Sequence, residues 1–245
     1  MFSPEKPVCT RRPVFFWMFN EDYLLFCRHM LFFYLIPVFM GIAFLASLTL
    51  FFQRDTEPYL KLFPFFLLLT LTVEIIGATM VLHIKNNLIL SNPFTVLAIC
   101  FYLFILHQFT HSRKVRKIIL YLICIYPAVA FFNIFFIQKM VVFHTMTYSL
   151  GCLLIVALCI YYFFELFQLT HTTNLLRQPS FWICSGLLFY FSCSFPLYGL
   201  NNLVTKTASP QTIRNLIFVF NLLDVFLYSS FTIAFLCRLR IRKST

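Results

Sequence analysis

Seven long apolar stretches follow one another along the chain between Leu31 and Leu236, and each is roughly 18 to 24 residues long. An α-helix needs about 20 apolar residues to cross the roughly 30 Å hydrocarbon core of a bilayer. The pattern predicts helices over residues 30–52, 62–83, 93–110, 118–137, 141–164, 181–204 and 214–237. Short polar segments such as RDTEPYLK and HSRKVRK separate them. The expected fold is an all-α integral membrane protein, a bundle of seven transmembrane helices.

This pattern divides the chain into three parts. We expect residues 1–29 to form an N-terminal interfacial or extracytoplasmic segment, in which Val14 to Phe26 approach the membrane with Trp17 and Tyr23 at headgroup level. Residues 30–237 form the transmembrane domain, and residues 238–245 a basic cytoplasmic tail. The N-terminal segment does not resemble a cleaved signal peptide, because Asn20, Glu21 and Asp22 interrupt it.

Composition agrees with the membrane assignment. Hydrophobic residues make up 61% of the chain and charged residues only 11%, whereas soluble domains contain about 25% charged residues. The 35 Phe and 5 Gly predict packing by bulky side chains rather than by close glycine contacts. The 9 Cys contain no C-x-x-C pair and lie mostly inside apolar stretches, which argues against a disulfide framework, a metal site and any cofactor.

The distribution of basic residues predicts the orientation. Seven crossings place eleven Lys and Arg on one side: Arg54, Lys61, Arg113, Lys114, Arg116, Lys117, Arg177, Arg238, Arg240, Arg242 and Lys243. The other side receives eight: Lys6, Arg11, Arg12, Arg28, Lys85, Lys139, Lys206 and Arg214. The dense runs at 113–117 and 238–243 adjoin helix ends, where the positive-inside rule acts most strongly. We therefore expect the C-terminus in the cytoplasm and the N-terminus outside, and we read the net charge of +11 as a topology signal.

Two carboxylates fall near the middle of predicted helices. Glu74 lies about halfway along the second helix and Asp224 about halfway along the seventh. An ionisable group at that depth costs several kcal/mol unless it is neutral, paired or hydrated, so it is a functional candidate by default. A proton or ligand site is one reading, and a protonated carboxyl that hydrogen-bonds a neighbouring helix is the other.

Histidine and asparagine residues add further candidates for ligand or proton binding. His83 and His144 lie near the predicted outer ends of the second and fifth helices, and Asn201 and Asn221 lie in the outer halves of the last two. Together with His29 the two histidines could form a pH-sensing or metal site, although they come from three separate helices. Isolated polar packing is the alternative, and we expect no bound metal.

Several functions known for seven-helix proteins are excluded by missing residues. Residues 214–237 contain no Lys, so a retinal Schiff base has no attachment point, and the last helix lacks the Asn-Pro-x-x-Tyr motif of G-protein-coupled receptors. No Ser/His/Asp set, H-E-x-x-H motif or P-loop is present. The chain also does not read as two similar halves, which disfavours a transporter built from repeats. We expect a protein that is not an enzyme.

Several strings together resemble those of a known group of proteins: LTVEIIG at 71–77, HIKNNLILSN at 83–92, GCLLIVALCIYYFFELF at 151–167, QPSFWICSGLLFYFSCSFP at 178–196 and FTIAFLCRLRIRK at 231–243. The chain resembles uncharacterised small seven-helix membrane proteins of Bacteroidota, which are often encoded beside histidine kinases. The resemblance implies a membrane-bound sensory partner. The third helix lacks an acidic residue near its start, so an acidic site shared with the group would depend on Glu74 alone.

These observations predict a sensory or signalling accessory in the bacterial inner (cytoplasmic) membrane. It would pass an envelope or small-ligand signal to a partner such as a histidine kinase. The expected docking surface includes the basic residues Arg113, Lys114, Arg116 and Lys117, for which contact with anionic lipid is the alternative. A small transporter or channel that uses Glu74 and Asp224 at mid-membrane is the alternative function.

Overall fold

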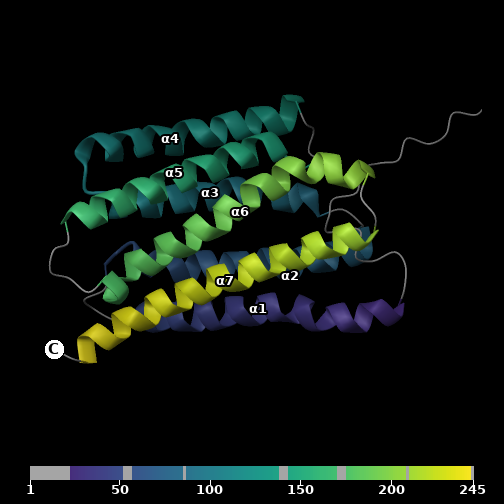
Figure 1. Ribbon diagram of the computed structural model, residues 1–245, viewed down its shortest axis with the longest axis horizontal. Coiled ribbons are helices and arrows are strands. Elements are labelled where there is room, and N and C mark those ends of the chain that lie inside the picture. Colours follow the sequence, from purple (N-terminus) through teal and green to yellow (C-terminus); the bar gives the residue numbers. More distant parts are fainter. Residues whose placement is uncertain are drawn as a thin grey trace, which may run out of the picture.

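A computed structural model describes residues 23–51, 57–84, 87–137, 143–169, 175–207 and 210–243 of the chain. Throughout these ranges the elements are helices, and no strand is present (Figure 1). The long helices are α1 (Tyr23–Phe51), α2 (Phe63–Ile84), α3 (Leu88–Phe109), α4 (Arg113–Phe132), α5 (Thr145–Leu169), α6 (Pro179–Thr207) and α7 (Pro210–Lys243). The short 3-10 helices η2 (Leu60–Leu62) and η4 (Leu175–Arg177) precede α2 and α6, and a π-helical turn, η3 (Asn133–Ile137), continues α4. The predicted all-α class is confirmed.

The outer surface of this bundle is apolar. Among the described residues, α2 to α7 each contribute a stretch long and apolar enough to cross a membrane, and α1 contributes the shorter stretch Leu35–Leu50. Large side chains face outward, with Phe136 77% and Phe167 64% exposed. So continuous an apolar exterior would be unfavourable in water, whereas it is favourable against the acyl chains of lipids. The chain is therefore a multi-pass membrane protein.

Six helices form a closed ring. α1 packs against α2 and α7, α6 packs against α5 and α7, and α3 completes the circuit by contacting α2 and α5. α4 lies outside the ring, against α3 and α5, at the edge of the molecule opposite α1 (Figure 1). This arrangement leaves the interior to be filled by side chains of α1, α2, α3, α5, α6 and α7.

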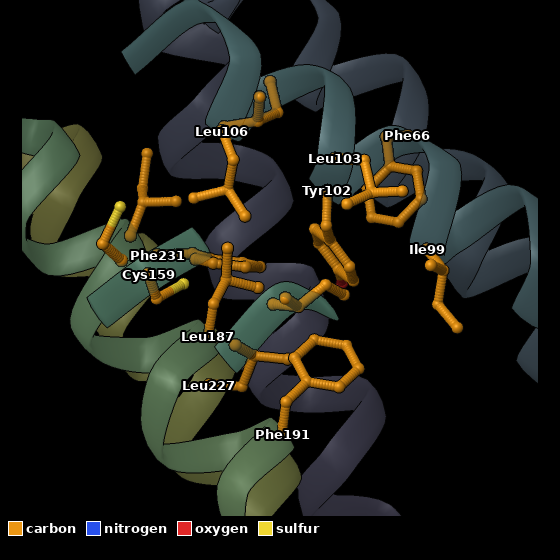
Figure 2. Close-up of a cluster of buried hydrophobic side chains, with 14 of the residues drawn as sticks. Phe66, Ile99, Tyr102, Leu103, Leu106, Cys159, Leu187, Phe191, Leu227 and Phe231 are labelled. Atoms are coloured by element: carbon orange, nitrogen blue, oxygen red, sulfur yellow. The ribbon is translucent and has the colours of Figure 1, made fainter. Parts of the chain in front are cut away.

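Aromatic and aliphatic side chains fill one half of that interior. Figure 2 shows the cluster in which Phe66, Tyr102, Leu103, Phe191 and Phe231 meet. Aromatic contacts extend it toward the end of the bundle where α2 begins. There the rings of Phe63 and Phe231 form an edge-to-face pair with centroids 5.6 Å apart. Such pairs favour a fixed packing beyond the simple burial of area.

Two glycines allow neighbouring helices to approach more closely than the Phe-rich sequence predicts. A Cβ added at Gly186 in α6 would lie 2.8 Å from Ser230 Cβ in α7. One added at Gly151 in α5 would lie 2.5 Å from Ile99 Cδ1 in α3. Neither glycine belongs to a pair spaced four residues apart, so no repeated small-residue motif marks these contacts in the sequence.

Several helix boundaries differ from the predicted ones by four or more residues. α1 begins at Tyr23 rather than at residue 30, and α5 extends from Thr145 to Leu169 rather than from residue 141 to 164. α3 begins at Leu88 rather than at residue 93 and contains Pro93 within its second turn. α4 begins at Arg113 rather than at residue 118, so the basic run at 113–117 is helical and not part of a loop. α7 continues to Lys243, and the segment predicted as a tail extends the helix, because Lys and Arg in the last turn interact favourably with the helix dipole.

Candidate functional site

Glu74 and Asp224 line the same cavity, which has a volume of about 310 Å³. Glu74 lies ten residues before the end of α2 at Ile84, and Asp224 lies fourteen residues after the start of α7 at Pro210. Each carboxyl is therefore near the middle of its helix. Each is partly exposed, because it faces the cavity.

The cavity occupies the half of the bundle where α2 and α6 end and α1, α3, α5 and α7 begin. We call this end the cavity end, and we call the opposite end, where α4 begins and α7 stops, the basic end. Asn87, the N-cap residue of α3, and Phe143, which precedes α5, both line the cavity. The cavity thus extends from the level of the connecting segments down to mid-membrane.

The cavity wall combines polar groups and aromatic rings. Its polar lining residues, besides the two carboxylates, are Thr70, Asn87, Ser91, Thr95, Tyr190, Tyr198, Asn221 and Tyr228. Phe94, Phe143 and Phe220 supply further aromatic surface. No Lys or Arg is present among these described lining residues. The enclosed space is therefore acidic, aromatic and rich in hydroxyl groups.

Tyr190 links the two parts of this site. Tyr190 of α6 and Asp224 of α7 both line the main cavity, together with Glu74 of α2. A smaller extension of about 100 Å³ shares Thr95, Tyr190 and Asp224 with the main cavity and continues inward to Tyr102. Asp224 thus stands at the junction of the two spaces.

Neither carboxyl has a basic partner in the described part of the chain. No Lys or Arg nitrogen among those residues lies within 4.0 Å of Glu74 or Asp224. Isolated carboxylates at this depth are costly, so they require a proton, a bound cation or water. The arrangement is therefore suited to hold a positively charged group, including a proton.

One side of the cavity is a connected set of rings. Tyr198 of α6 stacks on Phe143, with centroids 5.1 Å apart, and contacts Tyr148 of α5 at 4.5 Å and Phe220 of α7 at 4.8 Å. The two neighbouring helices and the segment before α5 hold Tyr198 in place. Its orientation is fixed before any ligand enters.

His144 lies immediately behind this wall and is fully buried. Its Nε2 is 2.6 Å from the hydroxyl of Thr95, and its Nδ1 is 2.8 Å from the hydroxyl of Thr147. Thr95 donates to the Asn92 carbonyl at 2.8 Å, and Asn133 Nδ2 donates to Thr147 at 3.2 Å. All four hydrogen bonds can form at once when the ring proton is on Nε2, which then donates to Thr95, and Nδ1 accepts from the Thr147 hydroxyl. The network joins α3, η3 and α5.

Burial of the imidazole lowers the pKa of His144, which precedes the apolar span of α5, to about 4. The neutral ring therefore serves as a hydrogen-bond bridge at neutral pH. The predicted association of His144 with His83 and His29 concerns side chains outside those that the structure describes. Across the described residues, no group of three His, Cys, Asp or Glu side chains could hold a metal ion.

A second carboxylate site lies at the basic end. Glu165 of α5 accepts hydrogen bonds from the backbone N–H groups of His111 and Ser112, each at 2.9 Å. The His111 ring nitrogen Nδ1 is 3.9 Å from Glu165 Oε2, the oxygen that accepts from the His111 backbone N–H. These bonds place a negative charge at the N-terminus of α4, which begins with four basic residues, Arg113, Lys114, Arg116 and Lys117, all exposed. The carboxylate offsets the unfavourable position of positive charge at a helix N-terminus.

The structure brings three of the predicted ligand candidates together. Glu74, Asp224 and Asn221 share the cavity, and His144 supports its wall through Thr95. The side chain of His83 and that of Asn201 lie outside the described part of the chain. The sequence reading missed the Thr, Ser and Tyr lining residues.

A spacing of four residues could have revealed them. It joins Thr70 to Glu74 on α2 and Asp224 to Tyr228 on α7, and twice that spacing joins Tyr190 to Tyr198 on α6. Residues four apart share one face of a helix.

Comparison with known proteins yielded no match: no protein-family model, no curated protein and no solved structure is significantly similar to this chain. The case for a function therefore rests on the geometry of the cavity and of the basic end.

Proposed function

We propose that the protein is a non-enzymatic sensory or signalling accessory that binds a small ligand in the cavity and reports it to a membrane partner such as a histidine kinase. In this proposal all seven long helices span a bacterial inner membrane, with the cavity end outside and the basic end in the cytoplasm. The observation that carries the proposal is that Glu74 and Asp224, from two different helices, line one cavity half-way into the bundle.

The packing below the cavity favours binding over open conduction. Between Asp224 and the basic end, the interior is occupied by side chains that are fully buried, including Leu103, Leu106, Phe231 and Phe235. Edge-to-face contacts of Phe63 with Phe231 and Phe235 close this region further. A ligand that enters from the cavity end therefore meets a packed floor, as in a receptor.

The helices that bear the site also reach the basic end, which provides a physical route for the signal. α2 and α7 carry the two carboxylates, and α7 continues to the basic segment ending at Lys243. The basic run that begins α4 is tied to α5 through Glu165. A ligand that changes the packing of these helices would move the exposed basic surface that a partner reads.

The proposal is tested by pairing substitutions at the two ends. Glu74→Gln and Asp224→Asn remove a charge from the cavity, and a fourfold Gln substitution at Arg113, Lys114, Arg116 and Lys117 neutralises the basic surface. We expect the first two variants to abolish the signalling response to the ligand. We expect the fourfold variant to abolish photocrosslinking to a kinase in native membranes from a photoreactive residue at the neighbouring exposed position 118. All should keep the wild-type melting temperature in detergent.

Two outcomes would contradict the proposal. If the cavity variants melt several degrees lower and keep every partner and response, the carboxyls are interhelical contacts. If crosslinking from position 118 yields lipid adducts only, the basic surface serves topology and membrane contact. A Lys117→Arg variant, which keeps the charge, is the matched control for the fourfold change.

A transporter is the second candidate, because Asp224 joins the cavity to its inward extension near Tyr102. Transport would require the packed floor to open in an alternate state. Counterflow of a labelled ligand in proteoliposomes tests it: accumulation abolished by Asp224→Asn would establish transport, and binding without flux would favour the sensor.

A further inference from the structure

We propose that the ligand of this cavity is a small organic cation, an amine or quaternary ammonium compound, held between the two carboxylates and the aromatic wall. This inference rests on the proposed ligand-binding function and specifies its ligand class.

The charge distribution selects a cation. Glu74 and Asp224 interact electrostatically across one cavity, and no basic residue is present among its described lining residues. Two neighbouring carboxyls repel each other when both are ionised, so a positive charge placed between them is attracted to both. An anionic ligand would add a third negative group to the same space.

The aromatic wall favours an organic cation over a metal ion. Phe143, Tyr198 and Phe220 form a continuous set of rings beside the carboxyls, with centroid separations of 5.1 and 4.8 Å. Aromatic faces attract alkylammonium groups, and cages of such rings are a recurrent means of binding quaternary ammonium ligands. A hard metal ion would instead need a compact set of oxygen ligands.

The cavity wall also carries hydroxyl groups. Those of Thr70 on α2 and Thr95 on α3 line the space beside the hydroxyl-bearing rings of Tyr190, Tyr198 and Tyr228. Hydroxyl oxygens accept hydrogen bonds, so the site favours a ligand that combines its positive charge with a polar donor group.

The volume limits the size of the ligand. About 310 Å³ lies at the lower end of the usual range for ligand pockets and is roughly twice a cavity of about 150 Å³ that accommodates benzene. The site therefore suits a compound such as choline or an arylalkylamine and is too small for a peptide or a lipid with two acyl chains.

The test compares cations with neutral analogues of the same shape. Full-length protein in lipid nanodiscs is titrated with choline and with 3,3-dimethylbutan-1-ol, and with phenethylamine and 2-phenylethanol. At least one cation should bind tenfold or more tightly than its neutral analogue, a difference of about 1.4 kcal/mol. Asp224→Asn and Glu74→Gln should each remove that preference, while Asp224→Glu should retain it.

Glu165→Gln is the matched control, since it removes a carboxylate at the basic end, far from the cavity, and should leave the preference unchanged. Tyr198→Leu should weaken the cation without weakening its neutral analogue. If neutral analogues bind as tightly as the cations, the ligand class is wrong while the proposed binding function stands. If none of the four compounds binds, the inference is overturned, and the response of the cavity variants in native membranes then decides the proposed function separately.

Discussion

Acidification from about pH 7.5 to about pH 5 should destabilise the folded bundle by about 2 kcal/mol through His144 alone. The ring is fully buried, and its pKa is about 4 in the folded protein against an ordinary value of 6.5. When the chain unfolds, the ring becomes free to take up a proton at pH values below 6.5. The unfolded state then binds more protons than the folded state, so stability falls with pH.

The magnitude follows from the width of that window. Each pH unit between the two pKa values contributes about 1.36 kcal/mol, and roughly 1.5 units separate 6.5 from pH 5, which gives about 2 kcal/mol. The contribution of neutral His144 to the free energy of unfolding is fully present above pH 6.5 and decreases as the pH falls. By about pH 4 it is lost, and the loss amounts to about 3 kcal/mol.

The assay is equilibrium unfolding by SDS in mixed micelles, with wild type and His144→Gln compared at both pH values. The glutamine keeps a polar contact to Thr95 or Thr147 but does not titrate. Subtracting the two pH dependences cancels every other ionisable group in the chain. Equal pH dependence in the two proteins would refute the reasoning. Thr95→Val is a control: it removes one hydrogen bond but leaves the imidazole in place, so it should keep the wild-type pH dependence.

Three further predictions concern packing and capping. Glu165→Ala should lower the free energy of unfolding by about 2–3 kcal/mol, since it removes the hydrogen bonds that the carboxylate accepts from two backbone N–H groups and from the Tyr161 hydroxyl. Hydrogen exchange at the start of α4 should increase, and unchanged exchange would contradict the prediction. Gly186→Ala should cost about 1–3 kcal/mol because its Cβ would meet Ser230, whereas Gly41→Ala in α1, with nothing within 4 Å, should be neutral or stabilising. Phe136→Leu, on the lipid-facing surface, should leave the melting temperature unchanged within the error of the measurement. A large drop would indicate that this face is buried against a partner.

The cavity shows where sequence reasoning was sufficient and where it was not. Glu74 and Asp224 are identifiable from the sequence because an ionisable group inside an apolar stretch stands out against its neighbours. Thr95 and Tyr190 do not stand out, since Thr and Tyr are common in membrane helices and their role depends on which face of the helix they occupy. The missing information was the rotation of each helix, which packing sets.

The sequence by itself determined that the chain is an all-helical membrane protein and located most of each apolar helix, because about 20 consecutive apolar residues have few other stable environments. It misplaced the helix boundaries at Tyr23, Leu88, Arg113 and Lys243, where helices continue beyond the predicted apolar stretch. The Glu165 carboxylate stabilises the start of α4, and basic residues at the end of α7 are favoured by the helix dipole. Only the tertiary structure placed α4 outside the ring and brought Glu74 and Asp224 to one cavity. These features depend on which helices pack together and in what rotation, and hydrophobicity along the chain is nearly the same for every arrangement.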